Sequence, residues 1–141
     1  MMRINIVYWS GTGNTKAMAE LIQQGAQDAG AAVTLTEVSS ADASAALDAD
    51  VVALGCPSMG SEVLEESEFE PFIVSIEGSV GGKKLALFGS YGWGIGEWMR
   101  DWGERMKKAG AELVVESLIV NDEPRDNTAR QCIDFGAAIA R

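Results

Sequence analysis

A run of small polar residues lies near the start of the chain, between an apolar segment and a helical pattern. Residues 10–15 read Ser-Gly-Thr-Gly-Asn-Thr, so each carries a hydroxyl, an amide or no side chain. Glycine lets a backbone approach a ligand closely, and the N–H groups of such a loop can converge on an anion. A helix that begins after the loop adds the positive end of its dipole. The pattern predicts a loop that binds a phosphate.

The residues at the end of this loop and directly after it limit which phosphate compound it can bind. A P-loop for nucleoside triphosphates requires Gly-Lys-Ser/Thr, but Gly13 is followed by Asn14. A dinucleotide-binding fingerprint requires a third Gly where this chain has Lys16. A plain strand–helix turn would not need hydrogen-bonding side chains at most of its positions. We therefore interpret the loop as a monophosphate site, with neutral side-chain donors at Ser10, Thr12, Asn14 and Thr15.

Two later loops carry residues suited to a planar ring. In the run 59–62, Gly60 allows a peptide unit to turn over, and Glu62 can either accept from a ring N–H or begin an acidic helix. Trp93 lies between two glycines with few local neighbours, so we expect it to cover a planar ligand. A phosphate at one end and an aromatic cover at the other describe a mononucleotide with a large ring, flavin mononucleotide (FMN) before any other.

The elements that must position these loops alternate along the chain. Short apolar runs predict strands at 3–9, 32–38, 51–55, 84–89 and 112–120, the last without a break. Amphipathic patterns predict helices at 16–29, near 69–76, at 97–109 and at 128–140, and a short helix within 39–50 capped by Ser40 or Asp42. The alternation predicts an α/β fold, a parallel sheet with helices on both faces. Each polar loop follows a strand, so we expect one composite site at the carboxyl edge of the sheet.

Composition and charge exclude several classes of protein. The chain has 141 residues, which we assign to one domain, 1–141. Its net charge is −10, and no Lys or Arg occurs between Ala17 and Gly82. Such a negative charge disfavours binding to nucleic acid and to anionic membranes, and it favours binding to basic partners. No apolar run is long enough to span a bilayer. Cys56 and Cys132 fit no metal-binding spacing, so we expect buried, reduced thiols in a cytoplasmic protein and no metal site.

The three loops resemble those of a known family. Residues 10–15, 59–62 and 89–94 are similar to the phosphate loop and the two isoalloxazine loops of flavodoxins, more specifically of the short-chain, clostridial type. The expected unbroken fifth strand also resembles the short-chain class, because long-chain relatives carry an insertion there. The resemblance covers nearly the whole chain. It implies a flavodoxin-like three-layer sandwich with a five-stranded parallel sheet in the order 2-1-3-4-5.

The resemblance also implies which residues bind FMN. Met59 would lie on the inner face of the isoalloxazine and Trp93 on the outer face, with Gly60 and Ser61 at N5 and Glu62 at the N3 proton. The whole implied set is Ser10, Thr12, Gly13, Asn14, Thr15, Ser58, Met59, Gly60, Ser61, Glu62, Ser90, Gly92 and Trp93.

The function implied is a low-potential one-electron carrier, not an enzyme. A flip of the Gly60–Ser61 peptide would stabilise the neutral semiquinone, and the acidic residues of 62–70 would disfavour the hydroquinone anion. We expect a monomer that shuttles between these two states and docks on basic patches of redox proteins. The alternative is an FMN-dependent quinone or NAD(P)H oxidoreductase, but the chain has no His. A receiver-type signalling module would need acidic residues where the first strand ends in Trp9-Ser10.

Overall fold

A computed structural model describes all residues from Met1 to Arg141. The elements follow one another in the alternating order that the sequence predicts. They are β1 (Arg3–Tyr8), α1 (Asn14–Asp28), β2 (Ala32–Glu37), a 3-10 helix η1 (Val38–Ser40), α2 (Ala43–Ala46), β3 (Val51–Gly55), α3 (Phe69–Glu77), β4 (Lys84–Tyr91), α4 (Glu97–Lys108), β5 (Glu112–Leu113), β6 (Leu118–Asn121) and α5 (Asn127–Ile139).

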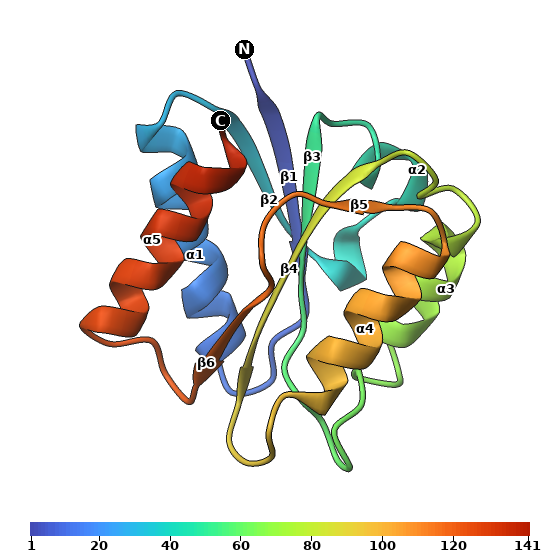
Figure 1. Ribbon diagram of the computed structural model, residues 1–141, viewed down its shortest axis with the longest axis vertical. Helices are drawn as coiled ribbons and strands as arrows, with labels where there is room; N and C mark the ends of the chain where they lie inside the picture. The colour runs from blue at the N-terminus through green and yellow to red at the C-terminus, as the bar shows by residue number, and fades with distance from the viewer.

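All strand pairs of the sheet are parallel, and the order is β2-β1-β3-β4-β5 as expected, with β6 also paired to β4. Helices α1 and α5 cover one face of the sheet, and α3 and α4 lie on the other face together with the short α2 (Figure 1). Parallel strands need crossover connections, and each crossover places a helix on one face or the other.

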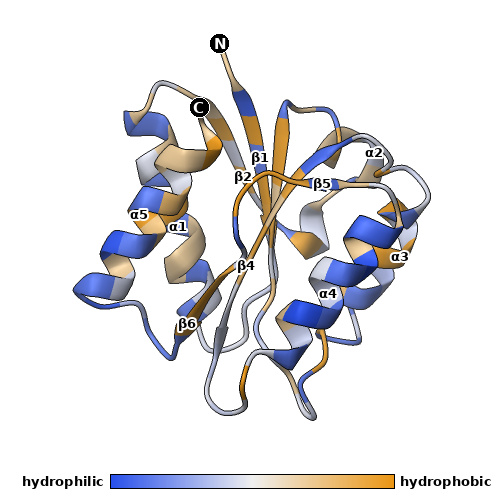
Figure 2. Cartoon of the chain, in the orientation of Figure 1, coloured by the Kyte–Doolittle hydropathy of each residue, from blue (hydrophilic) through white to orange (hydrophobic).

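Two apolar clusters, one on each face of the sheet, form the core. Because side chains alternate between the two faces along β1, Ile4 and Ile6 pack on the α1 and α5 side and Val7 packs on the α3 and α4 side. Trp98 and Trp102 of α4 are both buried in the cluster on the α3 and α4 side. The strands are mostly apolar in the middle of the fold, and the outer faces of the helices are hydrophilic (Figure 2). None of the helices has the length and apolar character that crossing a membrane requires.

The prediction of an unbroken fifth strand over 112–120 is wrong. β5 pairs with Lys84 and Leu85, whereas β6 pairs with the segment that begins at Phe88. Four residues, 114–117, therefore lie opposite only two residues of β4. Because the two extra residues cannot join the ladder, the chain leaves β4 there and returns in a shifted register. The run is apolar on both sides of the interruption, so its composition does not reveal the change of register.

The short helix predicted within 39–50 is α2, which has four residues. The 3-10 helix η1 precedes it. Asp42 caps α2, because its carboxylate accepts a hydrogen bond from the Ala45 N–H at 2.9 Å. Of the two predicted capping residues, Asp42 is therefore the correct one.

Candidate functional site

The loop between β1 and α1 is shorter than predicted, because α1 begins at Asn14. Gly13 is the N-cap residue, with φ at +99°, a conformation that favours glycine. The Ser10 hydroxyl oxygen accepts hydrogen bonds from the N–H groups of Gly13 at 3.1 Å and Lys16 at 3.2 Å. Ser10 thus ties the start of the loop to the first turn of the helix.

Several backbone donors of this loop have no acceptor in the protein. The N–H groups that donate to no protein atom include those of Gly11, Thr12, Asn14 and Thr15. A Cβ built on Gly13 would meet no atom within 4 Å, so the space in front of the loop is open. These donors lie at the N-terminus of a 15-residue helix, whose dipole adds to them. The arrangement fits an oxyanion such as a phosphate group.

Thr15 and Ser90 form a buried pair under this loop. The two hydroxyl oxygens are 2.9 Å apart, and the Ser90 N–H approaches the Thr15 hydroxyl oxygen at 3.4 Å. Strand β4 runs to Tyr91, two residues beyond its predicted end, so Ser90 belongs to the strand and not to the following loop. The Ser90 carbonyl accepts from the Ser58 N–H at 3.0 Å. Ser90 therefore joins the loops that follow β1 and β3.

The loop after β3 contains a narrow hairpin between Met59 and Val63. The two residues exchange backbone hydrogen bonds of 2.9 Å each. At its tip, Gly60 has φ at +51°, and a Cβ placed on it would meet nothing within 4 Å. The Gly60–Ser61 peptide makes no hydrogen bond to the protein. Nothing in the chain therefore holds this peptide unit in one orientation.

Glu62 connects this hairpin to the loop after β4. Its carboxylate accepts from the N–H groups of Ile95 at 3.0 Å and Glu97 at 2.6 Å, and so caps α4. The bond from Ile95 is the main reason that the pKa of Glu62 lies below its ordinary value; the bond from Glu97 lowers it further, and burial opposes both. Gly94 is required beside it, because a Cβ there would collide with the Glu62 carboxylate. The predicted contact with a ring N–H stays a prediction.

Glu62 does not begin the acidic helix that follows; that role belongs to Glu65. The buried Glu65 carboxylate accepts from the N–H groups of Glu68 and Phe69, each at 2.8 Å, and from Ser67. Burial raises the pKa of Glu65, but these hydrogen bonds outweigh it and leave the pKa below its ordinary value. Sequence reasoning missed this cap, because Glu65 is one of several acids in the run and nothing local shows that its carboxylate caps α3.

Trp93 lies outside the core, at the tip of the loop after β4. It is 65% exposed, and the neighbouring Ile95 is 74% exposed. Trp93 forms no ring–ring contact within the chain, whereas the buried Trp102 packs edge-on against Phe69 at 5.4 Å between centroids. An exposed Trp on a glycine-flanked loop is available to cover a ligand, and its stacking on one stays a prediction.

The acidic segment 62–70 presents less free charge than the sequence suggests. Two of its carboxylates cap helices, and Glu70 makes an ion pair with Arg105 at 2.7 Å. Arg105 also binds Glu77 at 2.7 Å. Only Glu66 and Glu68 of this segment are exposed acids, and Glu68 accepts from the Trp9 indole N–H at 3.2 Å.

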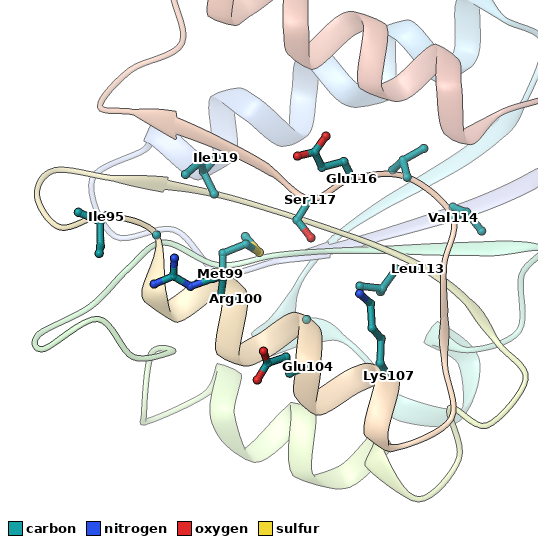
Figure 3. A pocket seen from close by; sticks show the side chains of 13 residues that line it. Ile95, Met99, Arg100, Glu104, Lys107, Leu113, Val114, Glu116, Ser117 and Ile119 are labelled. Carbon is teal, nitrogen blue, oxygen red and sulfur yellow. The ribbon is translucent and has the colours of Figure 1, made fainter.

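A cavity lies mostly away from the predicted loops. It has a volume of about 700 Å³ and lies between α4, which contributes Met99, Arg100 and Lys107, and the interrupted edge 113–119, which contributes Leu113 and Ile119 (Figure 3). Only Ile95 and Gly96 connect it to the loop after β4. The predicted site is instead an open edge where three loops meet. Both cysteines are free and buried, as predicted, and burial raises the pKa of each thiol to about 12.

Comparison with known proteins decides the family. The family model described as flavodoxin matches residues 6–136. The chain belongs to the flavodoxin family. It is 54% identical to a flavodoxin of Clostridium beijerinckii, over 97% of this chain and 99% of the relative, and 47% identical to one of Megasphaera elsdenii, over 98% of each. Both relatives are of the short-chain type, as predicted.

Solved structures agree with this assignment. The solution structure of two-electron reduced Megasphaera elsdenii flavodoxin matches with a TM-score of 0.89 at 44% identity, covering 97% of this chain and 98% of that one. Flavodoxins are electron-transfer proteins and not enzymes, and their cofactor is FMN. The unpartnered N–H groups around Gly13 fit the FMN phosphate, and the open Gly60 and exposed Trp93 fit the ring.

Proposed function

We propose that this flavodoxin is a low-potential one-electron carrier that uses FMN between the semiquinone and hydroquinone states and serves redox partner proteins. One observation carries the proposal: a loop with unpartnered N–H groups, a peptide without hydrogen bonds to the protein and an exposed Trp follow the carboxyl ends of the neighbouring strands β1, β3 and β4. The Thr15–Ser90 pair and the Glu62 cap of α4 hold these loops together. The arrangement holds a cofactor firmly at its phosphate and leaves its ring near the surface.

The residues proposed to bind FMN divide between its two ends. Backbone N–H groups and the side chains of the first loop bind the phosphate, assisted by the loop that follows β3. These residues are Ser10, Thr12, Gly13, Asn14, Thr15 and Ser58. The ring end is bound by Met59, Gly60, Ser61, Glu62, Gly92 and Trp93, with Met59 and Trp93 on its two faces.

The Gly60–Ser61 peptide is proposed to respond to the redox state. FMN, when bound, would supply one-electron chemistry coupled to a proton, and the carbonyl of Gly60 would serve as the acceptor for a ring N–H. Gly60 can turn its carbonyl toward it at little conformational cost, since glycine adopts both signs of φ and no neighbour blocks the movement. The hairpin that carries the peptide is closed at Met59 and Val63, so the flip does not disturb the rest of the loop.

Carboxylates near the ring end are proposed to set a low potential. The lowered pKa of Glu62 keeps it ionised at neutral pH. The Asp122 carboxylate lies 3.7 Å from the position of a Cβ built on Gly92, so it adds a second negative charge beside the same loop. Negative charges within several ångströms disfavour a further negative charge on a ligand between them. The reduced cofactor is then a strong electron donor.

Partners are proposed to be proteins with basic patches, and the carrier itself a cytoplasmic monomer. The net charge of −10 and the exposed Glu66 and Glu68 favour fast, salt-sensitive encounters with a basic surface. The buried thiols of Cys56 and Cys132, both unpaired, fit a reducing compartment.

The visible spectrum of the purified protein during stepwise anaerobic reduction tests the proposal. We expect a yellow protein that passes through a blue neutral semiquinone before full reduction. A protein that takes up no FMN, or that is reduced in a single two-electron step, would contradict it.

A further inference from the structure

The Thr15–Ser90 pair leaves one hydrogen without an acceptor. Two hydroxyl groups bring two hydrogens, and only one of them can lie in the 2.9 Å contact between the oxygens. The side chains are 1% and 4% exposed, so water has almost no access to either. The two hydroxyls make no other hydrogen bond to the protein. A buried donor of this kind is unfavourable until it meets an acceptor.

The backbone indicates which hydroxyl keeps the spare hydrogen. The Ser90 N–H approaches the Thr15 hydroxyl oxygen at 3.4 Å, so this oxygen is an acceptor in the pair. If the Ser90 hydroxyl donates to the same oxygen, both lone pairs of Thr15 are used and its own hydrogen points away from Ser90. Thr15 lies in the first turn of α1, and its backbone N–H also has no acceptor in the protein. The Thr15 hydroxyl and the Thr15 backbone N–H are therefore both free donors at the N-terminus of α1.

We propose that Ser90 is a positioning residue that holds the Thr15 hydroxyl as a hydrogen-bond donor toward the phosphate of FMN. The inference rests on the proposed function, since it concerns the anion that the loop 10–15 binds. In this proposal Ser90 acts through Thr15, in place of the direct contact with FMN that the resemblance implied for it. The Ser90 carbonyl also accepts a hydrogen bond from the Ser58 N–H. This bond is between backbone groups, so a change of the Ser90 side chain leaves it in place.

The test compares ligands with and without a phosphate. The apoprotein is titrated with FMN, with riboflavin and with inorganic phosphate, for the wild type and for Ser90→Ala. We expect Ser90→Ala to weaken FMN and phosphate binding about tenfold, because the Thr15 hydroxyl is then no longer oriented for its hydrogen bond to the charged phosphate. Riboflavin binding should not change. Ser75→Ala is the matched control, because it also removes a hydroxyl with one hydrogen bond, to the Phe72 carbonyl, outside the site.

A double-mutant cycle separates positioning from general support. In a Thr15→Val background the Ser90→Ala change should have almost no further effect, because no hydroxyl remains to be oriented. In a Thr15→Ser background the tenfold loss should return. Equal losses for FMN and riboflavin, or an unchanged phosphate affinity in Ser90→Ala, would overturn the inference.

The wild-type protein offers a test that needs no variant. NMR coupling across a hydrogen bond should connect the FMN phosphorus to the Thr15 hydroxyl hydrogen, and coupling to the Ser90 hydroxyl hydrogen instead would overturn the assignment. A wild type that binds neither FMN nor phosphate overturns the proposed function and this inference with it. A wild type that binds FMN, with Ser90→Ala unchanged, overturns the inference alone.

Discussion

The carboxylate of Glu62 accepts a 2.6 Å hydrogen bond from the backbone N–H of Glu97, at the first residue of α4. This bond joins the hairpin after β3 to the helix after β4, two segments that are 35 residues apart in the chain. Because the same carboxylate also accepts from Ile95, one side chain sets the distance between the two loops proposed to hold the ring. Its effects should appear both in stability and in the site.

Glu62→Gln should lower the stability of the apoprotein and flatten its dependence on acid pH. The hydrogen bonds to Ile95 and Glu97 hold the folded pKa of Glu62 below its unfolded value of about 4.3. The stability that the charge contributes is therefore present above that pH and is lost as the pH falls through the folded pKa. Thermal unfolding between pH 6 and 3 measures it.

Glu66→Gln is the matched control for this prediction, because Glu66 is exposed and accepts no hydrogen bond. Glu66→Gln should therefore show the same loss of stability between pH 6 and 3 as the wild type. If Glu62→Gln kept the full slope as well, the cap would contribute nothing to acid stability, and Glu65 would become the main candidate.

Trp93→Ala should weaken FMN binding by about fivefold and leave the apoprotein as stable as before. A side chain that is 65% exposed packs on little, so its removal creates no cavity. A lost aromatic stack on the ligand is worth about 1 kcal/mol, and the oxidised/semiquinone potential should move with it. Fluorescence titration and thermal unfolding provide the two measurements. Ile95→Ala, at a neighbouring exposed apolar residue, should change neither, and equal losses in both variants would indicate a general effect of the loop.

The order of the elements and the site-bearing loops could be predicted because both follow local patterns. Apolar runs such as 51–55 and glycine-rich turns such as 10–15 are visible in the sequence, and the parallel topology brings the ends of the strands together. The interruption at 114–117 could not be predicted, because it depends on the register against β4 and not on the composition of the segment.

The contacts within the site depend on long-range geometry. Glu62 and Glu65 both belong to an acidic run, and nothing in that run shows that one caps α4 and the other α3. Thr15 and Ser90 are 75 residues apart, so their pairing appears only once β4 lies beside α1. Residue types in a loop predict the ligand, whereas the partners that orient those residues require the fold.

Gly60→Ala should reduce the semiquinone yield without a steric clash. Its Cβ would meet no neighbour, but φ at +51° is unfavourable for Ala by about 1 kcal/mol. A Cβ also restricts the backbone of residue 60, so turning the Gly60–Ser61 peptide over becomes more costly while the packing stays intact. Gly78→Ala is the control, since Gly78 also has open space around its Cβ but a negative φ of −74°. An unchanged semiquinone yield in Gly60→Ala would mean that the peptide does not turn over.

Neutralising Glu66 and Glu68 together should slow electron transfer to a basic partner and reduce its dependence on salt. They are the exposed acids of the segment 62–70, and the others of that segment are engaged in caps or in the ion pair with Arg105. Exposed charges act mainly on the association rate, and salt screens them over about 10 Å. Stopped-flow rates from low to high ionic strength, measured with a basic cytochrome as acceptor, test this expectation.

The control for this pair is Glu20→Gln with Asp28→Asn, two exposed acids on α1 that give the same change in net charge. If the long-range field of the whole acidic protein steered the partner, both double variants would lose the same rate. If the partner docks beside the hairpin that carries Gly60, only the Glu66/Glu68 variant loses rate and salt dependence. Equal behaviour of the two variants at every ionic strength would therefore contradict a docking surface on this segment and leave net charge as the cause.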